Sequence, residues 1–181
     1  QSACDNMTRP FDLLIFGNQN DGLGGYTRWL TDLAVGSAGY PISGIFPLDD
    51  DMTLVTHGPR GMDRELDPET DPGLRGVRRM IGTASFTPAA FTSTDDARLL
   101  AGAIAEVSHR RIGLVGWGQL SYPSVSYWKE RFPDTEFVDA SEVIAPVKAV
   151  KSDQEIGQIR RAAAMQDAAL VQLANTIEVG M

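Results

Sequence analysis

Residues 111–138, with the sequence RIGLVGWGQLSYPSVSYWKERFPDTEFV, decide the fold class of this protein. The apolar run at 111–116 predicts a strand, residues 125–132 predict a helix, and residues 136–138 predict a second strand. Strands that alternate with helices in this way form layered folds in which some strands run parallel. The sequence therefore predicts an α/β protein with a mixed sheet flanked by helices.

The residues before this stretch supply the other strands. Residues 11–16 form a short continuous apolar run, which favours a strand covered on both faces. Residues 42–46 and 52–57 flank an acidic turn, so these two runs predict a β-hairpin. A further strand is predicted at 79–86, after a surface excursion at 58–73 that is charged and rich in glycine and proline.

Helices are predicted at 92–107, in the first half of 139–147 and, as one or two turns, at 26–33. The helix at 92–107 starts among hydroxyl and carboxylate side chains, which favour the amino end of a helix. Its apolar residues fall on one face, which is expected to contact the core: Leu99, Leu100, Ile104 and Val107.

A long C-terminal helix has the clearest start signal. Ser152 and Glu155 have the spacing of a capping box, in which each side chain satisfies a backbone amide that the helix start leaves unpaired. Gly180 is the expected stop signal. The apolar stripe of this helix needs a surface to cover, so we expect the helix to belong to a following domain. Its members are Ile156, Ile159, Ala163, Leu170, Leu173 and Ile177.

The composition of the 181 residues disfavours several classes of protein. A net charge of −8 and a pI of about 4.7 disfavour nucleic-acid binding, which relies on phosphate neutralisation by Lys and Arg. The single cysteine, Cys4, cannot form an internal disulfide. No apolar stretch approaches the roughly 20 residues that cross a bilayer. We therefore expect a cytoplasmic protein without nucleic-acid or membrane partners.

The chain contains no complete catalytic or metal-binding motif. Around Ser37 the first glycine of a serine-hydrolase elbow is absent. Residues 116–121 match a dinucleotide-binding turn only in part, because Ser121 stands where the third glycine is required. His57 and His109 lie far apart and lack the clustered ligands of a zinc site. We predict no catalytic residue and no metal ligand within these residues.

The segment 147–163 resembles a known family. Its sequence, VKAVKSDQEIGQIRRAA, is similar to the pattern R-x-x-K-S-x-x-E-I-x-x-I-R-x-A at the junction of the two domains in the aminopeptidase P, prolidase and creatinase family. The end of the chain, residues 177–181, is similar to the family's I-x-P-G-M, with Val179 in place of the proline. The matching residues at the junction include Lys151, Ser152, Glu155, Ile156, Ile159 and Arg160.

Three earlier segments are similar to parts of the family's first domain. Residues 11–17 resemble its first strand, and residues 26–32 are a looser relative of a Y-L-T-G segment, with Asp32 in place of the glycine. Residues 133–140 resemble the last strand, which leads into V-D-A-S. The resemblance covers the whole chain and is strongest after residue 136.

The resemblance implies two parts. Residues 1–150 would be a creatinase/prolidase-type N-terminal domain with a ribonuclease H-like fold, and residues 151–181 a linker and the first helix of a pita-bread catalytic domain. Family members hydrolyse a C–N bond, usually before proline, with two divalent metal ions (manganese, cobalt or zinc) held by two Asp, one His and two Glu. Those ligands would lie beyond Met181. These 181 residues alone are therefore expected to be inactive, with the peptide or small amide substrate bound through the missing domain.

The family's N-terminal domain supports dimerisation and overhangs the active site, so a homodimer is expected. Tyr26 and Arg28 would lie in the overhanging region, where Arg28 could bind a substrate carboxylate. These two are the candidate substrate-binding residues. Three alternatives stay open: Tyr26 packs in the core while Arg28 is solvated, the chain is a standalone dimerisation or small-molecule-binding module without hydrolase activity, or residues 116–121 bind a nucleotide.

Overall fold

A computed structural model describes residues 10–18, 25–33, 40–67, 69–86, 88–177 and 180. Cys4, Ser37, Val179 and Met181, which the sequence singled out, lie outside the described residues. The chain divides into two compact units, Gln1–Ile144 and Ala145–Met181. The expected domain boundary at residue 150 stays a prediction.

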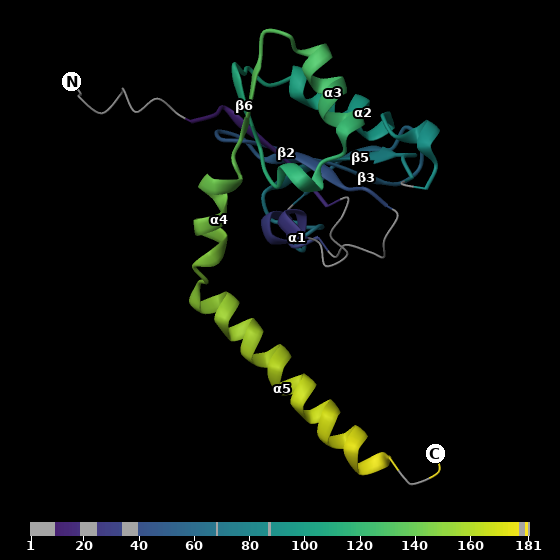
Figure 1. Cartoon of the computed structure of the whole chain (residues 1–181), viewed down its shortest axis with the longest axis vertical. Coiled ribbons are helices and arrows are strands. Elements are labelled where there is room, and N and C mark those ends of the chain that lie inside the picture. The colour runs from purple at the N-terminus through teal and green to yellow at the C-terminus, as the bar shows by residue number, and fades with distance from the viewer. Residues whose placement is uncertain are drawn as a thin grey trace, which may run out of the picture. The chain divides into compact units, whose positions relative to one another are not determined.

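Among the described residues, the first unit contains a seven-stranded mixed sheet with the order β4-β5-β3-β2-β1-β6-β7 (Figure 1). The pairs β1–β6, β3–β5 and β6–β7 are parallel, whereas β2 is antiparallel to both neighbours and β4 is antiparallel to β5. The predicted α/β fold with a mixed sheet is confirmed. The strands are β1 Leu13–Gly17, β2 Ser43–Pro47, β3 Met52–His57, β4 Asp63–Glu65, β5 Val77–Thr83, β6 Arg111–Leu114 and β7 Glu136–Asp139.

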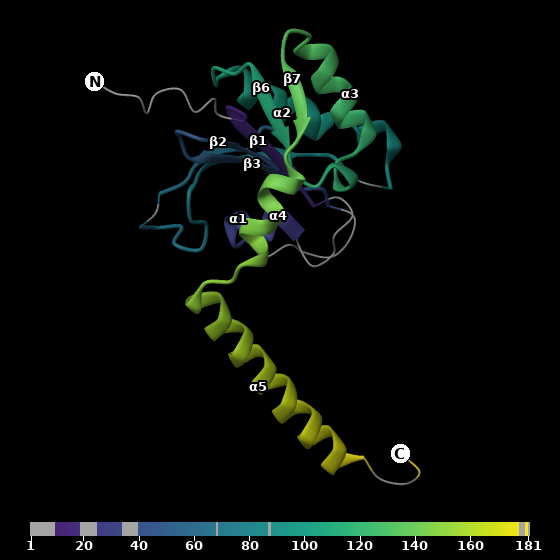
Figure 2. The ribbon, with the colours of Figure 1, turned by 60° about the vertical axis from the view of Figure 1, so that its left-hand side comes forward.

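The helices of the first unit cover both faces of this sheet. On one face, Leu13 and Ile15 of β1 belong to the same buried cluster as residues of α2 and α3. On the other face, Leu14 and Phe16 belong to a second cluster, against which α1 packs through Tyr26 and other residues. Figures 1 and 2 show α2 and α3 on one side of the sheet and α1 on the other. The helical elements of the chain are α1 Gly25–Thr31, η1 Ala90–Thr92, α2 Asp95–Ala105, η2 Trp117–Gln119, α3 Tyr122–Arg131, α4 Ser141–Ala149 and α5 Asp153–Thr176.

The predicted apolar face of α2 is confirmed. Leu100 and Ile104 are fully buried, and Leu99 and Val107 pack against the same cluster. Trp128 of α3 is also buried, and its Nε1 donates a hydrogen bond of 2.9 Å to a backbone oxygen of α2. Because the indole fills the space between α2 and α3 and satisfies its own polar atom, removal of this side chain would cost about 3–5 kcal/mol.

The predicted hairpin is confirmed, since β2 and β3 pair antiparallel across the turn at 48–51. The predicted surface excursion at 58–73 is wrong in part, because it contains β4. All three residues of this strand are exposed and charged, so no apolar alternation announces them. β4 is the edge strand of the sheet and pairs with β5 through backbone hydrogen bonds. Its charged side chains disfavour the addition of a further strand at this edge.

The helix predicted for the first half of 139–147 is longer than expected. α4 runs through Pro146 to Ala149, and the amide of Val150 donates to the carbonyl of Pro146 at 3.2 Å. A proline inside a helix removes one backbone hydrogen bond, which explains why the sequence favoured an earlier end.

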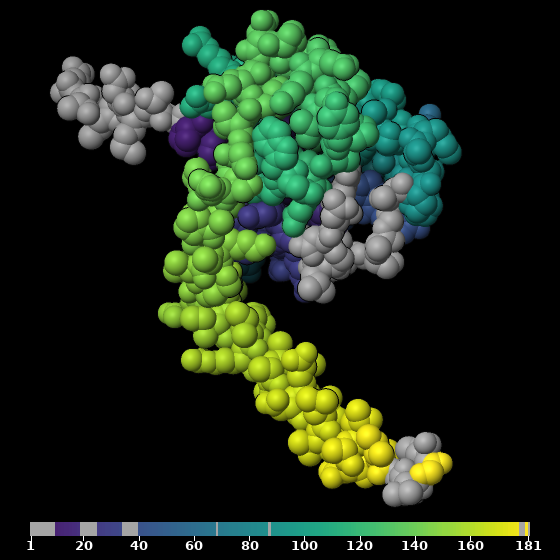
Figure 3. Space-filling view, in the orientation of Figure 1, coloured from purple at the N-terminus to yellow at the C-terminus, as the bar shows by residue number. Residues whose placement is uncertain are grey.

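The predicted long C-terminal helix is confirmed as α5, with its capping box. The amide of Glu155 donates to Ser152 Oγ at 3.2 Å, and the amide of Ser152 donates to a Glu155 carboxylate oxygen at 2.8 Å. The helix ends at Thr176, before the expected stop at Gly180. No residue of α5 is buried, and its side chains form the yellow-green surface in Figure 3. None of the helices in the described ranges is long and apolar enough to span a membrane.

Candidate functional site

Five strands of the sheet run in one direction: β1, β3, β5, β6 and β7. β1 and β3 are both antiparallel to β2, and the others are parallel to one of these two or to β6. Their carboxyl ends therefore share one side of the sheet, where open α/β sheets bind ligands. We call this region the carboxyl edge, defined by residues 17–18, 42–43, 57–58, 83–86, 115–116 and 139–141.

The chain leaves β1 and β6 toward opposite faces of the sheet. α1 follows β1 and packs against one buried cluster, whereas α3 follows β6 and contributes Val125 and Trp128 to the other. Two adjacent parallel strands whose connections diverge in this way create a crevice at their carboxyl ends. The ends of β1 and β6 are therefore the first place to look for a ligand.

Asn18, directly after β1, fixes the entry into β2. Its amide donates to the carbonyl of Ile42 at 3.1 Å, and its Oδ1 accepts from the amide of Ile42 at 2.7 Å. The hydroxyls of the buried residues Ser43 and Thr27 have no hydrogen-bond partner among the described residues. An unsatisfied buried hydroxyl costs about 1–3 kcal/mol, so a water or a polar ligand group that reached either one would be favoured.

The turn after β6 is closely packed by neighbouring side chains. Gly116 has φ 66° and ψ 56°, a left-handed conformation that favours glycine. A Cβ at this position would lie 3.0 Å from the Tyr26 ring and 3.2 Å from Oε1 of Gln119. The amino end of α3 is already capped, since Ser121 Oγ accepts from the amide of Ser124 at 3.3 Å. A pyrophosphate would have to displace these contacts, so the geometry does not favour the partial dinucleotide motif.

The segment Asp139-Ala140-Ser141 joins the ends of β6 and β7. Ser141 Oγ accepts from the amide of Gly116 at 2.9 Å, and Asp139 Oδ1 accepts from the amide of Ser141 at 2.8 Å. Hydrogen bonds from the side chain and the backbone of Ser141 lower the pKa of Asp139 below its ordinary value. Ala140 is buried against Gly113. The residues that matched a family motif in the sequence thus have structural roles at this edge.

Tyr26 and Arg28, the predicted substrate-binding residues, both lie on α1. Tyr26 is half-buried and packs against the second core cluster, whereas Arg28 is exposed. Residues two positions apart on a helix do not share a face, so the structure does not bring the two side chains together. Their role in substrate binding stays a prediction.

Asp32, which stands where the Y-L-T-G segment that residues 26–32 resemble has its glycine, has φ 58°. It is the one non-glycine residue with positive φ in the described ranges. Its amide donates to the carbonyl of Arg28 at 2.8 Å, so it ends α1 in the left-handed position that glycine usually occupies. Asp tolerates this conformation better than most residues. The sequence motif therefore identified a real backbone requirement.

Sequence reasoning missed an exposed aromatic group at this edge. The Tyr40 ring lies 4.1 Å from that of His57, at the end of β3, and 5.4 Å from that of Phe86, just after β5. Tyr40 and Phe86 are 43% and 38% exposed. These residues are far apart in the sequence. The antiparallel pairing of β2 with β3 brings Tyr40 to His57, and the parallel pairing of β3 with β5 brings Phe86 to the same edge. Exposed rings of this kind offer a flat apolar surface to a ligand.

A metal centre needs several clustered ligands. Within the described ranges, no three His, Cys, Asp or Glu side chains gather closely enough to hold an ion. His109 Nδ1 lies 2.7 Å from the carbonyl of Val107, and the ring stacks edge-on against Phe132. The described side chains therefore do not fit a metal pair.

Solved structures of three peptidases share this fold. An X-Pro aminopeptidase from Thermotoga maritima MSB8 matches 94% of this chain with a TM-score of 0.64 and 14% identity. A Xaa-Pro dipeptidase from Bacillus anthracis matches 94% with a TM-score of 0.57 and 18% identity. The prolidase from Pyrococcus horikoshii OT3 matches 94% with a TM-score of 0.54 and 15% identity. The fold that the sequence resemblance implied is confirmed.

The match covers only part of those proteins. This chain spans 42% of the Thermotoga structure and 40% of each of the other two. No protein-family model matches the sequence, and no curated protein matches it.

Proposed function

We propose that this chain is the non-catalytic N-terminal domain of a metal-dependent Xaa-Pro peptidase-like hydrolase. The observation that carries the proposal is the unequal coverage of the fold match. It extends over 94% of this chain but only 40–42% of the peptidase structures. A protein of that kind would therefore place its catalytic part in residues beyond these 181. The junction pattern at 147–163 supports the same division.

The proposed role of the domain is dimerisation and the gating of substrate access. The carboxyl edge supports this role, because divergent connections, a Ser43 hydroxyl that is unpartnered among the described residues, and exposed aromatic rings meet there. In a homodimer this edge would overhang a catalytic site, and peptides or small amides would pass it. Arg28 remains the candidate contact from α1, since it is exposed and has a side chain long enough to reach a ligand.

The two divalent ions of the proposed enzyme would be held by the catalytic domain, because the described residues of this chain do not cluster as metal ligands. We therefore assign no step of the reaction to residues of this chain. A cytoplasmic location is part of the same proposal.

The purified chain, incubated with Xaa-Pro dipeptides and manganese chloride, tests the non-catalytic role. We expect no release of free proline above a control that contains only buffer and metal. The product of the complete coding sequence, assayed in parallel, is expected to release proline. Metal-dependent cleavage by the 181-residue chain alone would overturn the proposal.

A standalone association module is the alternative. It is favoured by the exposed apolar residues of α5, among them Leu170 and Leu173, which are 64% and 56% exposed. A stop codon directly after Met181 would favour this alternative, since α5 would then have no following domain to cover it.

A further inference from the structure

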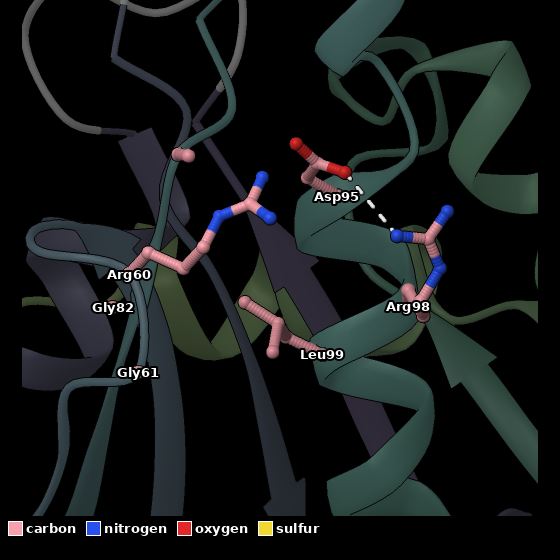
Figure 4. Close-up of a pocket in the computed structure, with 7 residues that line it drawn as sticks. Arg60, Gly61, Gly82, Asp95, Arg98 and Leu99 are labelled. Carbon is pink, nitrogen blue, oxygen red and sulfur yellow. Dashed lines mark hydrogen bonds and ion pairs between the residues drawn. The ribbon is translucent and has the colours of Figure 1, made fainter.

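A small cavity lies beside the carboxyl edge, between the loop after β3 and the start of α2 (Figure 4). Its volume is about 160 Å³, close to that of an engineered protein cavity of about 150 Å³ that holds benzene. The cavity therefore has room for a group of about six non-hydrogen atoms. It is lined by Arg60, Gly82, Ala84, Asp95, Arg98 and Leu99, among others.

The loop that carries Arg60 is held firmly on β5. The amide of Gly58 donates to Thr83 at 3.2 Å, the amide of Gly82 donates to Met62 at 2.8 Å, and both acceptors are backbone carbonyls. A side chain at Gly82 would lie 2.5 Å from the carbonyl oxygen of Pro59, so only glycine lets the loop approach this closely. Arg60 is thereby presented to the cavity by a fixed backbone.

The opposite wall is the first turn of α2. Asp95 and Arg98 form an ion pair at 3.3 Å, and Leu99 contributes an apolar surface. In Figure 4 the guanidinium of Arg60 extends across the cavity toward Asp95 and Leu99. Within the described ranges, Arg60 has no hydrogen bond or ion pair. Since Asp95 and Arg98 neutralise each other, the cavity keeps one net positive charge, that of Arg60.

Other arginines of the first unit are already paired with carboxylates. Arg64, Arg78, Arg79 and Arg111 each contact an Asp or Glu at 2.6–3.5 Å. Arg60 differs from them in facing a cavity with its hydrogen-bond donors unused. A planar guanidinium with free donors matches the geometry of a carboxylate.

We propose that this cavity binds a small molecule with one carboxylate beside an apolar group, and that Arg60 is the counter-ion. Leu99 and Ala84 would contact the apolar part of the ligand. A dianion such as phosphate suits the site less well, because its second negative charge has no counter-ion in a cavity with one net positive charge. The proposal does not depend on the peptidase assignment, since it concerns binding by this chain alone.

A titration of the ¹⁵N-labelled chain with isobutyrate, followed by NMR at constant ionic strength, tests the ligand class. We expect saturable shifts of the amides at 60–61, 82–84 and 95–99. Isobutyramide has the same shape without the charge and should cause none. Equal binding of isobutyramide, tighter binding of inorganic phosphate, or no saturable shift in these segments would each overturn the proposal.

Variants then test the role of Arg60. Arg60→Gln should weaken isobutyrate binding at least about tenfold, because a charged hydrogen bond is lost. Arg60→Lys keeps the charge and should lose less. Arg75→Gln removes an exposed positive charge away from this cavity and should leave the affinity unchanged. Arg60 is exposed, so its variants should keep the native spectrum. Equal affinity of Arg60→Gln and Arg75→Gln would contradict the assignment.

Discussion

Replacement of Gly116 with alanine tests the packing at the carboxyl edge. The left-handed backbone at Gly116 costs a residue with a Cβ about 1–2 kcal/mol. The lower entropy of alanine in the unfolded chain offsets about 0.5–1 kcal/mol of this. The new Cβ would also lie 3.0 Å from the half-buried Tyr26 ring, so the ring must move, at a cost of about 1–3 kcal/mol. Gly116→Ala should therefore lower the free energy of unfolding by about 2 kcal/mol.

Urea denaturation followed by tryptophan fluorescence measures this loss, because Trp128 is buried in the first unit. Gly118→Ala is the matched control. It lies two residues away, has open space where a Cβ would stand, and should change the stability by less than about 0.5 kcal/mol. Equal stability of the two variants would refute the left-handed turn and its contact with Tyr26.

Three further predictions concern other parts of the chain. Backbone amides of Arg110 and Arg111 donate to the Asp12 carboxylate and lower its pKa in the folded protein. The ionised carboxylate therefore stabilises the folded state fully above about pH 4, and this contribution is lost as the pH falls through the lowered native-state pKa. In the variant Asp12→Asn the free energy of unfolding should depend less steeply on pH below about pH 4. The same pH dependence in the variant and the parent chain would contradict this. Asp32→Gly should raise the unfolding free energy by up to about 1 kcal/mol, and a decrease would argue against its positive φ. Light scattering should show that the chain self-associates through the exposed apolar residues of α5, and that the double variant L170Q/L173Q is a 19.6 kDa monomer. A monomeric parent chain would exclude self-association through α5.

The elements predicted well from the sequence are those with local signals. α5 begins where Ser152 and Glu155 place its capping box, and the buried face of α2 follows the spacing of its apolar residues. β4 has no such signal, because its three charged residues pair through the backbone with a strand that only the tertiary fold supplies. α3 starts at Tyr122, earlier than predicted, since Ser121 caps it and Pro123 fits its first turn.

The candidate sites were less accessible to sequence reasoning. Tyr26 and Arg28 lie two positions apart in one short segment, yet the helical geometry of α1 separates their side chains. Arg60 faces Asp95 and Arg98 only because β5 holds the loop after β3 against the start of α2. No spacing in the sequence encodes that approach. The absence of a side chain at Gly82 is the one local trace of it, and its meaning becomes clear only from the contact with Pro59.

The coding sequence that follows the codon of Met181 tests the central claim most directly. If this chain is the N-terminal domain of a Xaa-Pro peptidase-like hydrolase, the reading frame continues and encodes, in order, two Asp, one His and two Glu in the arrangement expected for metal ligands. A stop codon directly after Met181 would contradict the claim, and so would a continuation without those five residues.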